Sequence, residues 1–276
     1  MTTTGVPDWV LTDDIVPAVR RQTGRDTLVI TTWSGERLRG AGESLGVWRL
    51  QGSADDGGGP VPWSIVLKGW PAEGPRMPPT AWDWPLRELE LYRSGILHDL
   101  PGGATSPRYV GDLVRPDGST WIWLEDVTGI PEDPWPLERY GTIARQLGQF
   151  NGAYLNGRPV PDLPYLSRSW LRQWVELAGP MMEMLADHAG NPVVWTIFPP
   201  HVIDALLRLW TVRHAIYASL EQLPQTFCHL DVFRRNIFYH AGTNGSARTV
   251  LVDWSFAGIA ALGEEIAPLV AASVSF

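Results

Sequence analysis

Residues 227–254 read FCHLDVFRRNIFYHAGTNGSARTVLVDW and contain two aspartates and an asparagine at spacings that indicate a joint task. Asp231 precedes Asn236 by five residues, in the pattern His-x-Asp-x-x-x-x-Asn, and Asp253 ends the apolar run TVLV. The two β-type runs on either side of an Asn-Gly turn signal predict an antiparallel hairpin. Such a hairpin would bring Asn236 beside Asp253, where oxygen ligands can hold a phosphate-bound magnesium ion. The stretch therefore predicts phosphoryl transfer.

The composition describes a globular protein of 276 residues, 44% of them hydrophobic and 19% charged. That length is sufficient for one large domain or for two lobes. The net charge of −8 argues against a nucleic-acid partner, because sequence-independent binding to phosphates needs a basic face. The same charge is compatible with a cationic small-molecule partner.

The single cysteine and the two chain ends favour a cytoplasmic protein without a membrane partner. Cys228 alone can form neither an internal disulfide nor a multi-cysteine zinc site, which fits a reducing compartment. Residues 1–14 lack the basic and apolar regions of a secretory signal. The apolar tail 256–276 is interrupted by two glutamates and a proline, so we do not expect it to span a membrane.

Lys68 is the only lysine among the 22 basic residues, and it ends the expected strand WSIVLK. Chance is the plain explanation for its position. The sharper explanation is that this site needs a compact, movable ammonium group rather than a planar guanidinium group. A helix expected over 86–97 carries Glu88 and Glu90, and either carboxylate can pair with Lys68. Glu88 is the preferred candidate because of the resemblance described below.

Three glycines precede this strand, in a predicted strand–turn–strand unit over 38–50. Gly40, Gly42 and Gly46 follow the spacing Gly-x-Gly-x-x-x-Gly, which is one residue longer than the glycine loop of protein kinases. Glycines let backbone amides approach a phosphate closely, so Gly42 is a candidate nucleotide contact. A tight hairpin that binds no ligand uses glycine in the same way.

The predicted elements divide the chain into two parts and indicate an α+β fold. Strands are expected at 28–33, 38–50, 63–68, 109–114 and 121–125, with helices at 8–22 and 86–97. After a breaker-rich segment, amphipathic helices are expected at 137–154, 170–185 and 201–223. We therefore predict an N-terminal nucleotide-binding lobe over 1–126 and a helical lobe over 127–276. We interpret the apolar stripes of the three helices as core packing.

The motifs resemble those of the aminoglycoside phosphotransferase / choline kinase-like family, whose members share the bilobal protein-kinase fold. The resemblance extends over nearly the whole chain, from about Leu28 onward. It rests on HLDVFRRN (229–236), LVDW (251–254), GIAALGEEIA (258–267), WLEDV (123–127), and Lys68 with the helix containing Arg87-Glu88 and Tyr92. The first two motifs are specific, and the others gain meaning beside them. An Ala-Pro-Glu segment is missing after Asp253, which favours a small-molecule kinase over a protein kinase.

The resemblance implies a role for each candidate residue. Asp231 would be the catalytic base, and Asn236 and Asp253 would hold Mg²⁺. ATP would be the phosphoryl donor, with GTP as the alternative. His229 would brace the loop. The nucleotide contacts would be Lys68, Glu88 that orients it, Gly42, Arg235 and the backbone of the hinge from Glu125 to Val127.

The implied activity is transfer of the γ-phosphoryl group to a hydroxyl of a small molecule, such as an aminoglycoside-like antibiotic, another natural product, an amino alcohol or a sugar. The alternative is a catalytically silent, nucleotide-binding regulatory module, although all catalytic residue types are present. Only 23 residues follow Asp253. Relatives usually continue through further helices that help to build the acceptor pocket, so the resemblance implies either a short form or a truncated one. The sequence identifies neither the acceptor nor the oligomeric state.

Overall fold

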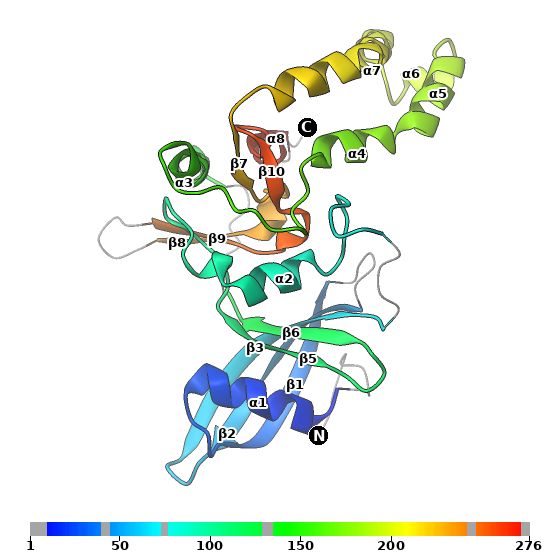
Figure 1. Ribbon diagram of the computed structural model, residues 1–276. Helices are drawn as coiled ribbons and strands as arrows, with labels where there is room; N and C mark the ends of the chain where they lie inside the picture. The colour runs from blue at the N-terminus through cyan, green and yellow to red at the C-terminus, as the bar shows by residue number, and fades with distance from the viewer. Residues whose placement is uncertain (1–9, 40–44, 73–76, 129–134, 242–246, 272–276) are drawn as a thin grey trace.

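The computed structural model describes residues 10–39, 45–72, 77–128, 135–241 and 247–271. They form an antiparallel sheet with a helix across one face, followed by a mainly helical part on the opposite side (Figure 1). The bilobal α+β fold expected from the sequence is confirmed. No helix in these ranges combines the length and the apolar character that a membrane crossing requires.

The N-terminal sheet has five antiparallel strands in the order β1-β2-β3-β6-β5. Their bounds, and those of the helix that covers them, are Val29–Arg39 (β1), Gly46–Asp55 (β2), Pro60–Trp70 (β3), Tyr109–Val114 (β5), Thr120–Glu125 (β6) and Thr12–Thr23 (α1). Side chains alternate along β3, so that Ile65 and Leu67 are buried against α1, whereas Val66, Lys68 and Trp70 lie on the other face. This alternation directs Lys68 toward the second lobe.

Helix α2, Arg87–Ser94, connects the two parts of the molecule (Figure 1). It is shorter than the predicted helix because Gly95 adopts a left-handed conformation (φ 77°), which ends the helix at Ser94. Leu89 on α2 belongs to the same buried apolar cluster as Ile122 in the sheet and Trp254 in the second part. The two lobes therefore share a continuous apolar core.

The second part is built around helix α3 and two small sheets. One sheet has three strands in the order β4-β9-β8, and the other pairs β10 with β7. The Phe150 ring of α3 contacts the rings of Phe227 and Trp254 edge-on. The bounds are Ala104–Thr105 (β4), Leu137–Leu155 (α3), Gln225–Cys228 (β7), Ile237–Ala241 (β8), Ala247–Leu251 (β9), Gly258–Ala261 (β10) and Ile266–Ala271 (α8), with 3-10 turns at Ile96–His98 (η1), Arg234–Asn236 (η2) and Trp254–Phe256 (η3).

Four further helices, α4 to α7, extend away from the sheets (Figure 1). Their bounds are Trp170–Glu176 (α4), Gly179–Asp187 (α5), Pro192–Trp195 (α6) and Pro200–Glu221 (α7). The prediction of one helix over 170–185 is wrong, because α4 ends before Leu177 and Pro180 lies in the first turn of α5. Proline lacks an amide proton and fits only the first turn of a helix, so it interrupts the pattern here.

The prediction that the apolar stripes of the helical lobe are core packing is confirmed along α3, where Ile143, Leu147 and Phe150 are buried. It is wrong at exposed positions around α4 and α5. Leu177 is 63% exposed and Met181 is 60% exposed, and among the described residues of α7 only Ile203 and Tyr217 are buried. A helical period shows that apolar side chains share one face, but burial requires a neighbouring layer to cover that face. Within the described ranges, Leu177 and Met181 lack such a layer.

Candidate active site

Strands β8 and β9 form the antiparallel hairpin predicted from the sequence, which is confirmed. Ile237 lies opposite Leu251, and the Val252 N–H donates to the Asn236 carbonyl oxygen at 3.0 Å. Asn236 immediately precedes the first strand, and Asp253 lies just beyond the second. The hairpin therefore brings both candidate metal ligands to one end of the sheet.

Asp231 lies in a loop between β7 and η2, where its carboxylate is 6% exposed. The Asn236 Nδ2 donates to Asp231 Oδ2 at 2.6 Å and to the Asp231 carbonyl oxygen at 3.0 Å. The Arg235 guanidinium donates to Oδ1 at 3.1 Å. Burial raises the pKa of Asp231, and the Arg235 charge opposes that rise. The carboxylate is thus held in place and has an increased proton affinity, which suits a general base.

His229 braces this loop, as the sequence predicted. The Asp231 N–H donates to His229 Nδ1 at 3.2 Å, and the other ring nitrogen lies 3.1 Å from the Val252 carbonyl oxygen. A backbone N–H can only donate, so His229 Nδ1 is the acceptor. The other ring nitrogen, Nε2, therefore carries the proton and donates to the Val252 carbonyl oxygen. Burial lowers the pKa of His229 to about 4, which keeps the ring neutral. His229 therefore connects the Asp231 backbone to the strand that leads to Asp253.

Glu265 also supports the loop that contains Asp231, and it was not identified as a site residue from the sequence. Its Oε2 accepts from the His229 N–H at 2.6 Å, although the carboxylate is almost fully buried. The next residue, Leu230, has a φ of 65°, a left-handed conformation that is strained for a branched side chain. A buried acceptor at this point helps to hold the strained turn that presents Asp231.

We expect Glu265→Gln to flatten the dependence of stability on pH. Burial raises the pKa of Glu265 to about 7, although the hydrogen bond from the His229 backbone lowers it in part. Between its ordinary value near 4.5 and about 7, the folded chain retains a proton that the unfolded chain has released. The free energy of unfolding of the wild type should therefore fall by roughly 3 kcal/mol across this window.

The measurement is urea-induced unfolding at several pH values, with Glu138→Gln on the exposed start of α3 as the matched control. In Glu265→Gln most of this fall in the free energy of unfolding with rising pH should be absent, and in Glu138→Gln the fall should be as large as in the wild type. An unchanged slope in Glu265→Gln would show that the carboxyl group does not carry the shift.

The predicted ion pair between Lys68 and Glu88 is confirmed. Lys68 Nζ lies 2.5 Å from Glu88 Oε2, and it also donates to Asp253 Oδ1 at 2.7 Å and to Ser255 Oγ at 3.2 Å. Glu90, the competing candidate, pairs with Arg93 on the same helix at 2.9 Å. Burial alone would lower the pKa of Lys68, but the two carboxylates outweigh it and raise the pKa. The ammonium group is charged and lies between both lobes.

Asp253 and Asn236 fit a magnesium ion in their chemistry. Burial raises the pKa of Asp253, but the Lys68 ammonium outweighs this effect and holds the pKa below its ordinary value. Oδ1 accepts from Lys68 and Ser255, whereas Oδ2 makes no hydrogen bond to any described residue. The described residues contain no cluster of three or more histidine, cysteine or acidic side chains that could hold a metal alone. One carboxylate and one carboxamide beside bound phosphates is the arrangement that Mg²⁺ often uses.

Arg87 connects the helix that carries Glu88 to the segment after Asp253, and the sequence did not indicate this role. The side chain is fully buried and donates to backbone carbonyls only, including those of Tyr165 at 2.7 Å and Ser255 at 2.6 Å. Burial lowers the pKa of Arg87 to about 10, opposed by the nearby Asp83. Arginine on a helix is usually solvated, so no sequence pattern distinguishes this one.

These groups border a cleft of about 610 Å³ between the two lobes. Seven of the predicted site residues line it, namely Lys68, Glu88, Glu125, Val127, Arg235, Asn236 and Asp253. Asp231 is joined to two of them through its hydrogen bonds from Arg235 and Asn236. Gly42 lies outside the described residues.

The hinge side of the cleft is formed by Leu124 to Val127. The Glu125 N–H is already used, because it donates to the Arg108 carbonyl oxygen at 2.9 Å. The Val127 N–H makes no hydrogen bond to the described part of the chain. Asp126, which the sequence analysis assigned no role of its own, accepts from Arg49 at 2.9 Å and thereby joins the hinge to β2.

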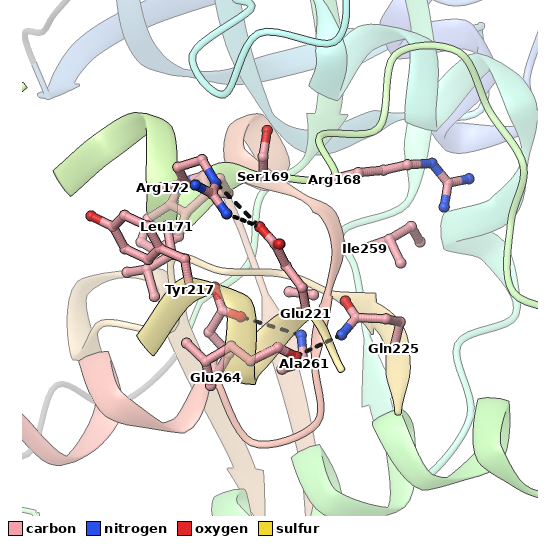
Figure 2. Close-up of a pocket in the computed structure, with 13 residues that line it drawn as sticks. Arg168, Ser169, Leu171, Arg172, Tyr217, Glu221, Gln225, Ile259, Ala261 and Glu264 are labelled. Atoms are coloured by element: carbon pink, nitrogen blue, oxygen red, sulfur yellow. Dashed lines mark hydrogen bonds and ion pairs between the residues drawn. The ribbon is translucent and has the colours of Figure 1, made fainter. Parts of the chain in front are cut away.

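A second hollow lies between α4, α7 and β10 (Figure 2). Its volume of about 30 Å³ has room for roughly one water molecule. Arg172 on α4 pairs with Glu221 on α7 at 2.5 Å across one side (Figure 2). This hollow is a packing feature and does not compete with the cleft.

Comparison with one solved structure supports the fold, and two further structures are similar at lower TM-scores. The complex of APH(2")-IIia with GDP and kanamycin aligns over 90% of this chain and 74% of its own, with 15% identity and a TM-score of 0.50. An aminoglycoside phosphotransferase from Alicyclobacillus acidocaldarius aligns over 89% of this chain and 68% of its own, with 16% identity and a TM-score of 0.48. Choline kinase LicA from Streptococcus pneumoniae aligns over 95% and 74%, with 13% identity and a TM-score of 0.44.

Comparison with protein families is more specific. No curated protein gives a significant match to the chain. The model of the phosphotransferase enzyme family, abbreviated APH, matches residues 76–275. This range contains α2, the hinge, the loop with Asp231 and Asn236, and the segment of Asp253. Because the match covers most of the chain, the protein belongs to the phosphotransferase enzyme family.

Proposed function

We propose that the protein transfers the γ-phosphoryl group of ATP, with Mg²⁺, to a hydroxyl group of a small molecule. This proposal depends on one observation: Lys68, Asp253 and Asn236 line the same cleft, and Asn236 is hydrogen-bonded to Asp231. A cleft of about 610 Å³ lies within the usual range for ligand sites. The family match supports phosphotransfer in general, and the donor, the metal and the acceptor are our assignments.

The nucleotide base would lie against the hinge, where the backbone of Glu125 to Val127 lines the cleft. We propose that residues 1–126 act as the nucleotide-binding lobe and residues 127–276 as the lobe that holds the acceptor. Phosphate oxygens would replace Asp253 as partners of Lys68, which releases Asp253 for the metal. Neutralisation of charge on the β- and γ-phosphate oxygens is the chemistry that Mg²⁺ supplies when Asn236 and Asp253 hold it.

In the transfer step, the acceptor oxygen attacks the γ-phosphorus and forms the new P–O bond. The bond between the γ-phosphorus and the β,γ-bridging oxygen breaks, and ADP leaves with that electron pair. The hydroxyl proton passes to the Asp231 carboxylate, whose raised proton affinity suits it for this role. Arg235 and Asn236 hold the carboxylate in a fixed orientation, which is the main requirement of phosphoryl transfer. An intracellular site of action fits both the ATP supply and the unpaired Cys228.

The test is a panel of hydroxyl-bearing acceptors with ATP or GTP, assayed for release of nucleoside diphosphate and for the phosphate ester by mass spectrometry. We expect an ester to form only with Mg²⁺ present, and the rates with ATP and GTP identify the donor. The competing function is a silent, nucleotide-binding regulatory module. Tight binding of Mg-ATP without an ester from any acceptor would favour that module over our proposal.

A further inference from the structure

We propose that four aromatic rings beside Asp231 form the acceptor-binding wall, and that the acceptor is a hydroxyl compound with a flat, apolar ring body. The aromatic wall consists of Trp82, Phe256, Trp170 and Trp174. The inference rests on the proposed function, because it names the class of molecule that receives the phosphoryl group.

The four rings form a continuous series that starts in the loop before α2 and ends on α4. Trp82 stacks on Phe256 with ring centroids 5.3 Å apart and an interplanar angle of 16°. Phe256 meets Trp170 at 6.4 Å, and Trp170 stacks on Trp174 at 5.7 Å with an angle of 5°. Three separate segments supply these rings, so tertiary folding aligns them.

The aromatic wall adjoins the groups that we assign to catalysis. Trp170 and Phe256 pack against the buried cluster of Cys228, Leu230 and Ala260, and Leu230 immediately precedes Asp231 in the chain. Phe256 also lies in η3, directly after Ser255, whose hydroxyl donates to Asp253 at 2.8 Å. A molecule on this wall would therefore lie next to both the proposed base and a proposed metal ligand.

Buried hydrogen bonds hold the Trp82–Phe256 end of the wall. The Arg87 Nη1 donates to the Trp82 carbonyl oxygen at 2.7 Å and to the Ser255 carbonyl oxygen at 2.6 Å. The Gln173 side chain on α4 accepts from the Trp82 N–H at 3.0 Å. The backbone that carries Trp82 and Phe256 is thus held in place before any ligand arrives, which reduces the entropy cost of binding.

One face of each ring lies against its stacking partner, and the rings of the wall are otherwise partly accessible. Trp174 is 51% exposed, and the other three rings are partly exposed. Elsewhere an arginine covers an aromatic face, as Arg213 covers Trp210 at 3.8 Å. Within the described ranges, no arginine or lysine covers the four rings in that way. An accessible aromatic face is suited to stacking with a flat ring of a ligand.

Charges around the wall do not favour a polycation. Arg168 pairs with Asp162 at 3.0 Å, and Glu176 on α4 pairs with Arg213 at 3.0 Å. Arg172 pairs with Glu221 on α7 (Figure 2). Asp83, beside Trp82, offsets the charge of the buried Arg87. Because the nearby charges are compensated, the wall offers apolar contact rather than a concentrated negative field.

The experiment compares 2-(2-naphthyl)ethanol, which joins a flat ring system to a primary hydroxyl, with kanamycin and choline as cationic acceptors. KM and kcat for each are measured with saturating Mg-ATP, and binding is measured by saturation-transfer NMR with Mg-ADP present. We expect the naphthyl alcohol to bind and to be phosphorylated. Trp174→Ala should raise its KM about fivefold to tenfold, with kcat and the Kd of Mg-ATP unchanged, because one stacking face is lost.

Trp195→Ala is the matched control, because Trp195 is 41% exposed on α6 and lies outside the aromatic wall. It should leave the KM of the naphthyl alcohol unchanged. The inference is overturned if Trp174→Ala has no effect on KM, or if only kanamycin or choline reacts. It is also overturned if ultracentrifugation finds a dimer of this chain that Trp174→Ala dissociates, since the wall would then be an interface. If Mg-ATP does not bind to the wild type at all, the proposed function itself fails.

Discussion

Asp231→Asn is expected to lower kcat about a thousandfold and to leave the Kd of Mg-ATP nearly unchanged. The carboxamide has the same size, and its single oxygen can still accept from Asn236, so the loop should keep its conformation although the hydrogen bond from Arg235 to the Oδ1 position is lost. It cannot accept the hydroxyl proton, however. General bases typically contribute factors of about 10² to 10⁴, which sets the size of the effect.

The measurement is single-turnover ester formation by rapid quench, with the best acceptor found in the panel. Asp204→Asn, on an exposed position of α7, is the matched control and should retain wild-type turnover. A titration of Mg-ADP by calorimetry separates loss of chemistry from loss of binding. If Asp231→Asn keeps more than about a tenth of wild-type turnover, Asp231 is not the base, since a base should contribute far more.

Asp253→Asn is expected to remove the Mg²⁺ dependence of nucleotide binding and to lower kcat by about a thousandfold. Asp253 adopts a left-handed conformation with φ 65°, which asparagine also tolerates well. The substitution therefore removes the charge and keeps the backbone preference. Electrostatic stabilisation of the developing charge is usually a large part of such catalysis, with losses of about 10² to 10³ for a single donor.

The variant should also be less stable at neutral pH. Burial raises the pKa of Asp253 in the folded state, but the Lys68 ammonium outweighs burial and lowers it. Its charged form thus contributes stability above the unfolded pKa of about 4, and this contribution is lost as pH falls through the folded pKa. Asparagine lacks this contribution at every pH. For each variant, the melting temperature with Mg-ATP must therefore be compared with the melting temperature of the same variant without ligand.

Asp112→Asn on β5 is the control for this second prediction. The pKa of Asp112 is also lowered, because hydrogen bonds from Arg93 and Tyr109 outweigh burial. Asp112 does not line the cleft. We expect Asp112→Asn to lose some stability and to keep the full Mg²⁺-dependent shift. If Asp253→Asn keeps the Mg²⁺-dependent shift in melting temperature that the wild type shows, its assignment as a metal ligand is contradicted.

Local pattern was sufficient to predict the sheet and the hairpin. Alternation along WSIVLK placed Lys68 on a strand, and the Asn-Gly signal placed the turn between β8 and β9. The pairing of Lys68 with Glu88 rather than Glu90 needed the family resemblance, because both glutamates lie in the first turn of α2. Strands β4, β7 and β10, with four residues or fewer, are too short to show alternation.

The helical lobe was predicted less well. The apolar faces of α4, α5 and α7 follow a helical period, but their burial depends on what lies beside them. The roles of Arg87 and Glu265 were equally invisible, since each acts on backbone atoms of a distant segment. Residue identity carries little information about which carbonyl or amide group a buried side chain will meet.

The sequence by itself determined that Asn236 and Asp253 come together, because a hairpin relates its own ends by simple register. Only the tertiary structure decided that Lys68 meets Asp253, from which it is separated by 185 residues, at 2.7 Å. It also decided that aromatic rings from three segments contact one another. Spacing specifies contacts within one element, whereas contacts between lobes depend on how their faces pack.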